Sequence, residues 1–110
     1  MTEERIQKIK SAVEAADHIS PETKAELLDV ITKLKPAIAK VAQTHQEDAR
    51  SISQFIEASA QEAANKRKHP EGLERILVKL KQSVQKFEAS HPELTAFVTE
   101  YSALLSSYGI

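Results

Sequence analysis

His45 and Asp48 are the pair of side chains whose types and spacing could bind a ligand. They stand three residues apart, so on a helix both would project from one face. An imidazole beside a carboxylate could form half of a metal site or a His–carboxylate pair. Ferritin-like di-iron sites need Glu-x-x-His on two helices, and no Glu lies three residues before His45. We therefore expect His45 to set the register between paired helices, with a small-ligand or metal-binding bundle using His45 and Asp48 as the alternative.

Two further histidines, His69 and His91, each precede a proline and could suggest a zinc site. The helix expected between them has about twenty residues, which places them on the order of 30 Å apart. One chain cannot use both on a single ion, so we expect them to cap helices. The basic run Lys66-Arg67-Lys68 is expected to interact with the carbonyl groups at the end of a helix and not with nucleic acid.

The sequence lacks the motifs that enzymes commonly use. Two glycines in 110 residues leave no glycine-rich phosphate loop and no Gly-x-Ser-x-Gly motif. The absence of cysteine excludes thiol catalysis and cysteine-ligated zinc. Most carboxylates alternate with Lys and Arg, as on solvated helix faces. We expect no enzymatic activity, no catalytic residue and no cofactor.

The charges of the chain are balanced. Its 15 basic and 16 acidic side chains give a formal net charge of −1 at pH 7. Such a chain lacks the positive field that attracts nucleic acid or anionic membranes. No apolar stretch approaches the roughly 18 residues of a membrane span, and the acidic N-terminus is unlike a signal peptide. We expect a cytoplasmic protein that binds neither nucleic acid nor membrane.

Helices must position all of these side chains. Apolar residues recur at spacings of three and four almost throughout, and no alternating run of β-branched residues indicates a strand. Pro-Glu pairs at Pro21, Pro70 and Pro92 predict helix starts, because Pro suits the first helical position and Glu complements the helix dipole. The sequence predicts one all-α domain over residues 1–110. Its expected helices cover about 3–17, 21–67, 70–89 and 92–108.

The longest expected helix, over 21–67, keeps its apolar phase through Pro36. A proline inside a helix kinks or breaks it, and the unbroken phase favours a kink over a chain reversal at Pro36. One such helix would span roughly 70 Å, about twice the diameter of a compact globule of this size. We expect an elongated bundle of coiled-coil-like helical hairpins with one long kinked helix and no strands.

The excess length of this helix predicts self-association, most simply as a homodimer. If the other helices cover its two ends, its middle is left for a second copy. Residues 94–110 carry one charged side chain, Glu100, and many small neutral ones, which allow close helix packing. Gly109 is expected to close the last helix. The interface candidates are Ile38, Val41, His45, Phe97, Tyr101, Leu104 and Tyr108.

Two C-terminal segments resemble a known family. The run Phe-Glu-Ala-Ser-His-Pro-Glu-Leu at 87–94 and the ending Leu-Ser-Ser-Tyr-Gly-Ile at 105–110 are similar to short bacterial proteins of domain of unknown function family 4404. Residues 55–63 are similar to its longer members, and the resemblance covers about residues 51–110. Members carry Asn and then Met or Leu where this chain has Ser107 and Tyr108. The resemblance implies a bacterial source and a helical fold, and it transfers no catalytic or binding residue.

Together these observations predict a small, non-enzymatic bacterial helical protein. Its expected working surface is a helix face, used for self-association or for docking an unidentified protein partner.

Overall fold

The computed structural model describes residues 2–65 and 70–108, with the backbone alone for 70, 107 and 108. The described chain forms five α-helices: α1 (Glu3–Ala15), α2 (Pro21–Ala42), α3 (Gln46–Ala64), α4 (Pro70–Val84) and α5 (Pro92–Tyr108). A short 3-10 helix, η1 (Gln85–Phe87), follows α4. No strand occurs in these residues, so the prediction of an all-α helical bundle is confirmed.

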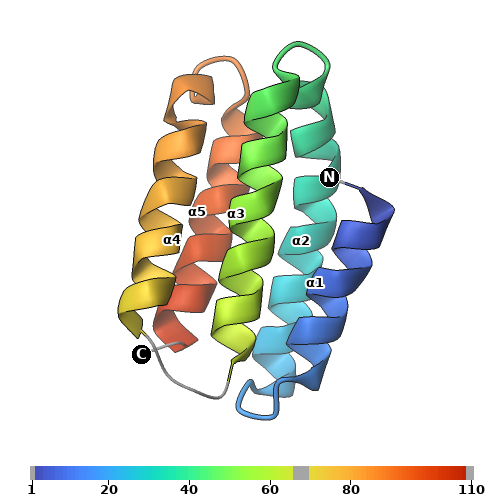
Figure 1. Cartoon of the computed structure of the whole chain (residues 1–110), viewed down its shortest axis with the longest axis vertical. Coiled ribbons are helices and arrows are strands. Elements are labelled where there is room, and N and C mark those ends of the chain that lie inside the picture. The colour runs from blue at the N-terminus through green and yellow to red at the C-terminus, as the bar shows by residue number, and fades with distance from the viewer. Residues whose placement is uncertain (1, 66–69, 109–110) are drawn as a thin grey trace.

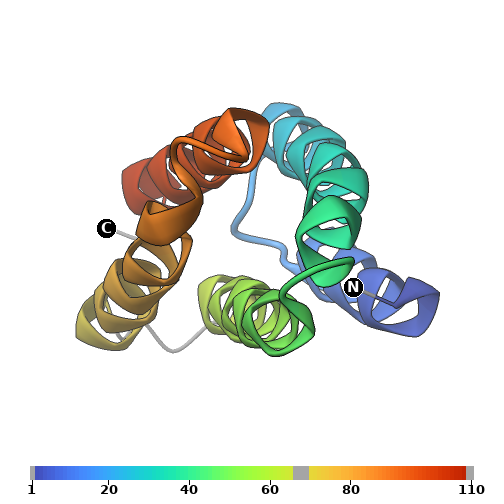
Figure 2. The same cartoon turned by 90° about the horizontal axis from the view of Figure 1, so that it is seen from above.

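Helices α2, α3, α4 and α5 run alternately up and down and enclose a common core (Figure 1). The remaining helix, α1, lies against α2 and α3 on the outside of this group of four (Figure 2). The radius of gyration is 13.0 Å and the molecule measures 38 × 26 × 20 Å. A radius near 13 Å is typical of a compact domain of this length, so the molecule is not elongated.

The apolar stripes predicted from the spacing of three and four form this core. Each helix contributes side chains with little or no exposed surface, and α2 contributes the longest stripe. The largest fully buried side chains are Ile9, Leu27, Val30, Ile31, Leu34, Ile38, Ile52, Ile56, Leu80, Leu94, Tyr101 and Leu105. The chain therefore buries a continuous apolar core within a single copy.

The single helix expected over 21–67 is wrong, because the chain reverses direction between α2 and α3. Pro36 does not cause the reversal, since it lies inside α2, which continues to Ala42. Residues 43–48 are six consecutive polar residues, so a continued helix would have no apolar side chain to pack here. His45 has φ −137° and ψ 67°, outside the helical region.

The helix starts follow the local sequence signals. Helices α2, α4 and α5 begin at the prolines of the three Pro-Glu pairs. Thr2 and Ser20 cap α1 and α2, because each hydroxyl accepts a hydrogen bond from the backbone N–H three residues on. The ends differ from expectation: α1 stops at Ala15 and α4 at Val84. The expected cap at 109–110, His69 and the basic run 66–68 lie outside the described residues.

Candidate functional site

His45 and Asp48 do not form a ligand pair in the structure. His45 lies exposed in the turn before α3, so the expectation that it sets the register between paired helices is wrong. Its Nδ1 atom is 2.8 Å from the Thr44 hydroxyl oxygen. Asp48 lies in the first turn of α3, where its Oδ1 atom is 2.7 Å from the ammonium nitrogen of Lys86. Each of the two side chains therefore interacts with a different neighbour.

The structure instead joins His45 to His91 through Phe87. The Phe87 ring centroid lies 5.2 Å from that of His45 and 5.8 Å from that of His91, and both contacts are edge-on. The spacing of His45, Phe87 and His91 in the sequence does not predict this contact, because it depends on the chain reversal at the end of α2. Over residues 2–65 and 70–108, no three His, Cys, Asp or Glu side chains form a group that could hold a metal ion.

The predicted interface residues divide between the core and the surface. Ile38, Val41 and Tyr101 have no exposed surface in a single chain, so in this fold they cannot contact a second copy. Phe97 and Leu104 are half-buried at the edge of the core. His45 is exposed, and the side chain of Tyr108 lies outside the described residues.

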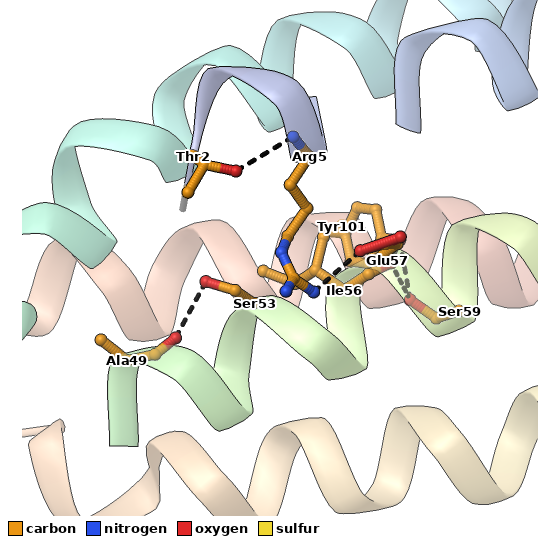
Figure 3. Close-up of polar contacts among 8 residues, drawn as sticks. All are labelled: Thr2, Arg5, Ala49, Ser53, Ile56, Glu57, Ser59 and Tyr101. Carbon is orange, nitrogen blue, oxygen red and sulfur yellow. Dashed lines mark hydrogen bonds and ion pairs between the residues drawn. The ribbon is translucent and has the colours of Figure 1, made fainter. Parts of the chain in front are cut away.

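Tyr101 is the centre of a buried polar contact between α5 and α3 (Figure 3). Its hydroxyl donates to the Ile56 carbonyl at 3.0 Å and lies 2.7 Å from the Ser59 hydroxyl, whose single proton is shared between the Tyr101 oxygen and the same carbonyl. Burial raises the pKa of Tyr101 far above its ordinary value, and the hydrogen bond with Ser59 lowers it only in part. The phenol therefore stays protonated and serves as a structural contact.

A shallow groove of about 230 Å³ runs between α2 and α5. Lys40 and Glu93 face each other across it at 3.8 Å, and the Lys33 nitrogen lies 5.9 Å from the Phe97 ring centroid. Lys33 also pairs with Asp29 at 3.1 Å, which raises the pKa of the lysine. We call this groove, together with the adjoining exposed face of α5, the α2–α5 surface. Its lining residues are Lys33, Pro36, Ala37, Lys40, Glu93 and Phe97, and the exposed α5 face adds Ala96, Thr99, Glu100 and Ala103.

A second hollow, of about 260 Å³, lies where α1, the end of α2 and the start of α3 meet. Arg5 lies beside it and pairs with Glu57 of α3, with 2.8 Å between Nη1 and Oε1 (Figure 3). Ser53 also faces it, with its hydroxyl donating to the Ala49 carbonyl at 2.8 Å. The lining residues are Thr2, Arg5, Ala42, Gln46, Ala49, Arg50 and Ser53.

No family model, curated protein or solved structure matches this chain. The resemblance to family 4404 therefore stays a prediction. Among the described helices, none is both long and apolar enough to cross a membrane.

Proposed function

We propose that the protein is a non-enzymatic helical module that associates with a second copy of itself through the α2–α5 surface. The supporting observation is the chemistry of the outer face of α5. Its exposed positions include Ala96, Thr99 and Ala103, which are small and neutral. A helix face in contact with water usually carries Lys and Glu, whereas small side chains let two helices approach closely.

The charges beside this face are complementary between two copies. Helix α5 contributes only acidic charges, from Glu93 and Glu100, whereas the adjoining flank of α2 contributes Lys33 and Lys40. A two-fold pair places the same patch of both copies in contact. In the pairing that we propose, α5 of one copy faces α2 of the other, so that carboxylates oppose lysines. The half-buried Phe97, which lines the groove, supplies apolar area.

A dimer does not follow from one long helix over 21–67, because this part of the chain forms two shorter helices, α2 and α3, packed side by side. Each copy already buries its own core, so the proposed association is reversible and depends on concentration. An interface of standard size covers about 800 Å² on each partner, roughly one eighth of the 6415 Å² exposed by this chain.

Light scattering and sedimentation from micromolar to millimolar concentration test the proposal. We expect a mass that rises from the chain mass of 12.2 kDa toward about twice that value. Ala103→Arg introduces a large charge on the exposed face of α5 and is expected to hold the protein at the chain mass.

The matched control is Ala58→Arg, at an exposed alanine of α3, which lies diagonally across the bundle from α5 (Figure 2). This variant is expected to associate like the unmodified protein. A wild-type protein that stays at the chain mass at every concentration would contradict the proposal, and so would equal disruption by the two arginines.

A further inference from the structure

We propose that the hollow between α1 and the start of α3 binds a small oxyanion of the phosphate class. This site lies apart from the α2–α5 surface, and it does not depend on self-association. The inference follows from the side chains that converge on the hollow from two helices and from the lack of any carboxylate among its lining residues.

Two guanidinium groups line the hollow, Arg5 from α1 and Arg50 from α3. A guanidinium presents five N–H donors in a planar fork, which matches the spacing of phosphate oxygens. The Gln46 amide and the Thr2 hydroxyl add neutral hydrogen-bond donors on the same lining. These four side chains provide donors and positive charge, which is the combination that recognises an oxyanion.

The two arginines have different neighbours. Arg5 uses Nη1 to bind Glu57, and this ion pair holds its guanidinium beside the hollow while its other N–H groups stay available (Figure 3). Arg50 is exposed, and among the described residues no carboxylate forms an ion pair with it. The charge of Arg50 is thus the local positive charge that an anion would neutralise.

The start of α3 adds backbone donors. Its N-cap residue, His45, makes no side-chain cap bond, so the first N–H groups of the helix lack the partner that Thr2 gives to α1. Uncapped N–H groups at a helix start favour an anion, and the two carboxylates of this first turn, Glu47 and Asp48, do not line the hollow. Asp48 in the same turn pairs with Lys86, and neither residue lines the hollow.

The dimensions favour one small anion over a polyanion. A hollow of about 260 Å³ accommodates a single tetrahedral oxyanion with its remaining water. The whole chain has a formal net charge of −1, so it lacks the wide basic surface that a nucleic acid backbone needs.

A titration of the ¹⁵N-labelled full chain with inorganic phosphate, followed by amide chemical shifts, tests the site. Sodium chloride at matched ionic strength and pH gives the reference. We expect saturable shifts for the amides of residues 2–5 and 46–50, against small linear shifts in chloride. A parallel titration with glycerol phosphate shows which kind of phosphate the site prefers. If glycerol phosphate binds more tightly than inorganic phosphate, the ligand is a phosphate monoester, and if the two bind equally, it is free phosphate. Either result supports the site.

Two variants make the test specific. Arg50→Gln removes the uncompensated charge and is expected to weaken phosphate binding about tenfold or more. Gln46→Glu places a carboxylate of nearly equal size in the hollow and is expected to abolish saturable binding.

The matched control is Arg75→Gln, which removes one charge from an exposed position of α4 and is expected to leave phosphate affinity unchanged. Circular dichroism establishes that each variant is folded. Linear shifts in phosphate like those in chloride would overturn the proposal, as would equal weakening by Arg50→Gln and Arg75→Gln. Both outcomes are independent of the mass of the protein in solution.

Discussion

At the scale of the residue, the buried hydroxyl of Tyr101 makes part of the stability depend on pH. The phenol donates to the Ile56 carbonyl and meets the Ser59 hydroxyl without exposed surface. Burial raises its pKa in the folded state, so the unfolded chain loses this proton at a lower pH than the folded protein does. The contribution is complete below the ordinary tyrosine pKa of about 10 and is lost progressively as the pH rises above it.

We therefore predict that Tyr101→Phe lowers the free energy of unfolding by about 1–2 kcal/mol at neutral pH, since the Ile56 carbonyl and the Ser59 hydroxyl each lose the phenol as a buried hydrogen-bond partner. The difference between wild type and variant should shrink above a pH of about 10, because only the wild-type protein carries this titrating group. Urea unfolding of both proteins across a series of alkaline buffers measures it. A difference that stays constant or grows with pH would mean that Tyr101 is not protected from ionisation.

His45 and Tyr101 show which residue properties the sequence can predict. Tyr101 falls in phase with Leu94, Val98 and Leu105, so its helix face could be predicted from spacing alone. Its hydrogen bonds could not, because they depend on which helix packs against α5. His45 falls in the apolar phase of α2 only when that phase is continued through six polar residues, none of which is buried. The polar run itself was the available signal for the chain reversal.

At the scale of the element, Pro36 weakens α2 without ending it. The helix continues past the proline because Leu34, Ala37 and Ile38 remain packed in the core. Proline has no N–H, so the Thr32 carbonyl lacks its usual backbone partner four residues on. Tertiary packing therefore overrides a local signal that favours a break.

We predict that Pro36→Ala raises the free energy of unfolding by about 2 kcal/mol, because the restored hydrogen bond outweighs the greater freedom of the unfolded chain. Pro92→Ala is the matched control, since a proline at the first position of α5 costs no hydrogen bond and its removal should change little. Chemical denaturation of both variants measures the two effects. A Pro36→Ala protein no more stable than Pro92→Ala would show that α2 compensates for the missing bond.

The positions of the helix starts were the most predictable feature, because Pro, Glu and a capping hydroxyl favour a helix start through the backbone groups of neighbouring residues. Helix ends and the α2–α3 reversal were less predictable, since they depend on what packs beside them. Periodicity and the start signals placed α1, α4 and α5 as separate helices but joined α2 and α3 into one, and the pairing of α1 with α2 and α3 had no local signal.

At the scale of the whole molecule, α1 stands apart from the other helices. It contacts α2 and α3 through Ile6, Ile9 and Val13, and among the described residues it has no contact with α4 or α5. Polar contacts at its N-terminal end include Arg5 with Glu57. The buried apolar cluster is continuous through α1, but loss of α1 would leave every contact among α2 to α5 in place, because α1 contacts only α2 and α3.

We predict that the amides of α1 exchange with solvent through a local opening of lower free energy than the unfolding of α2 to α5. Leu80→Ala, at a fully buried position of α4, should lower the protection of α2 to α5 by about 2–5 kcal/mol. It should leave the opening of α1 unchanged as long as global unfolding remains the costlier process. Ile9→Ala, at a fully buried position of α1, should lower the protection of α1 itself by a similar amount.

Native-state hydrogen exchange of the three proteins, read residue by residue, distinguishes the two modes of opening. If α1 opens by itself, Leu80→Ala lowers the protection of the amides in α2 to α5 but not of those in α1. The reason is that Leu80 lies in α4, a helix that α1 does not contact. Equal protection of all five helices in the wild type, with an equal loss everywhere in both variants, would show that the molecule unfolds as one unit. In that case the packing of α1 on α2 and α3 would be as strong as the core of the four-helix group, and the hollow between α1 and α3 would open only when the whole chain unfolds.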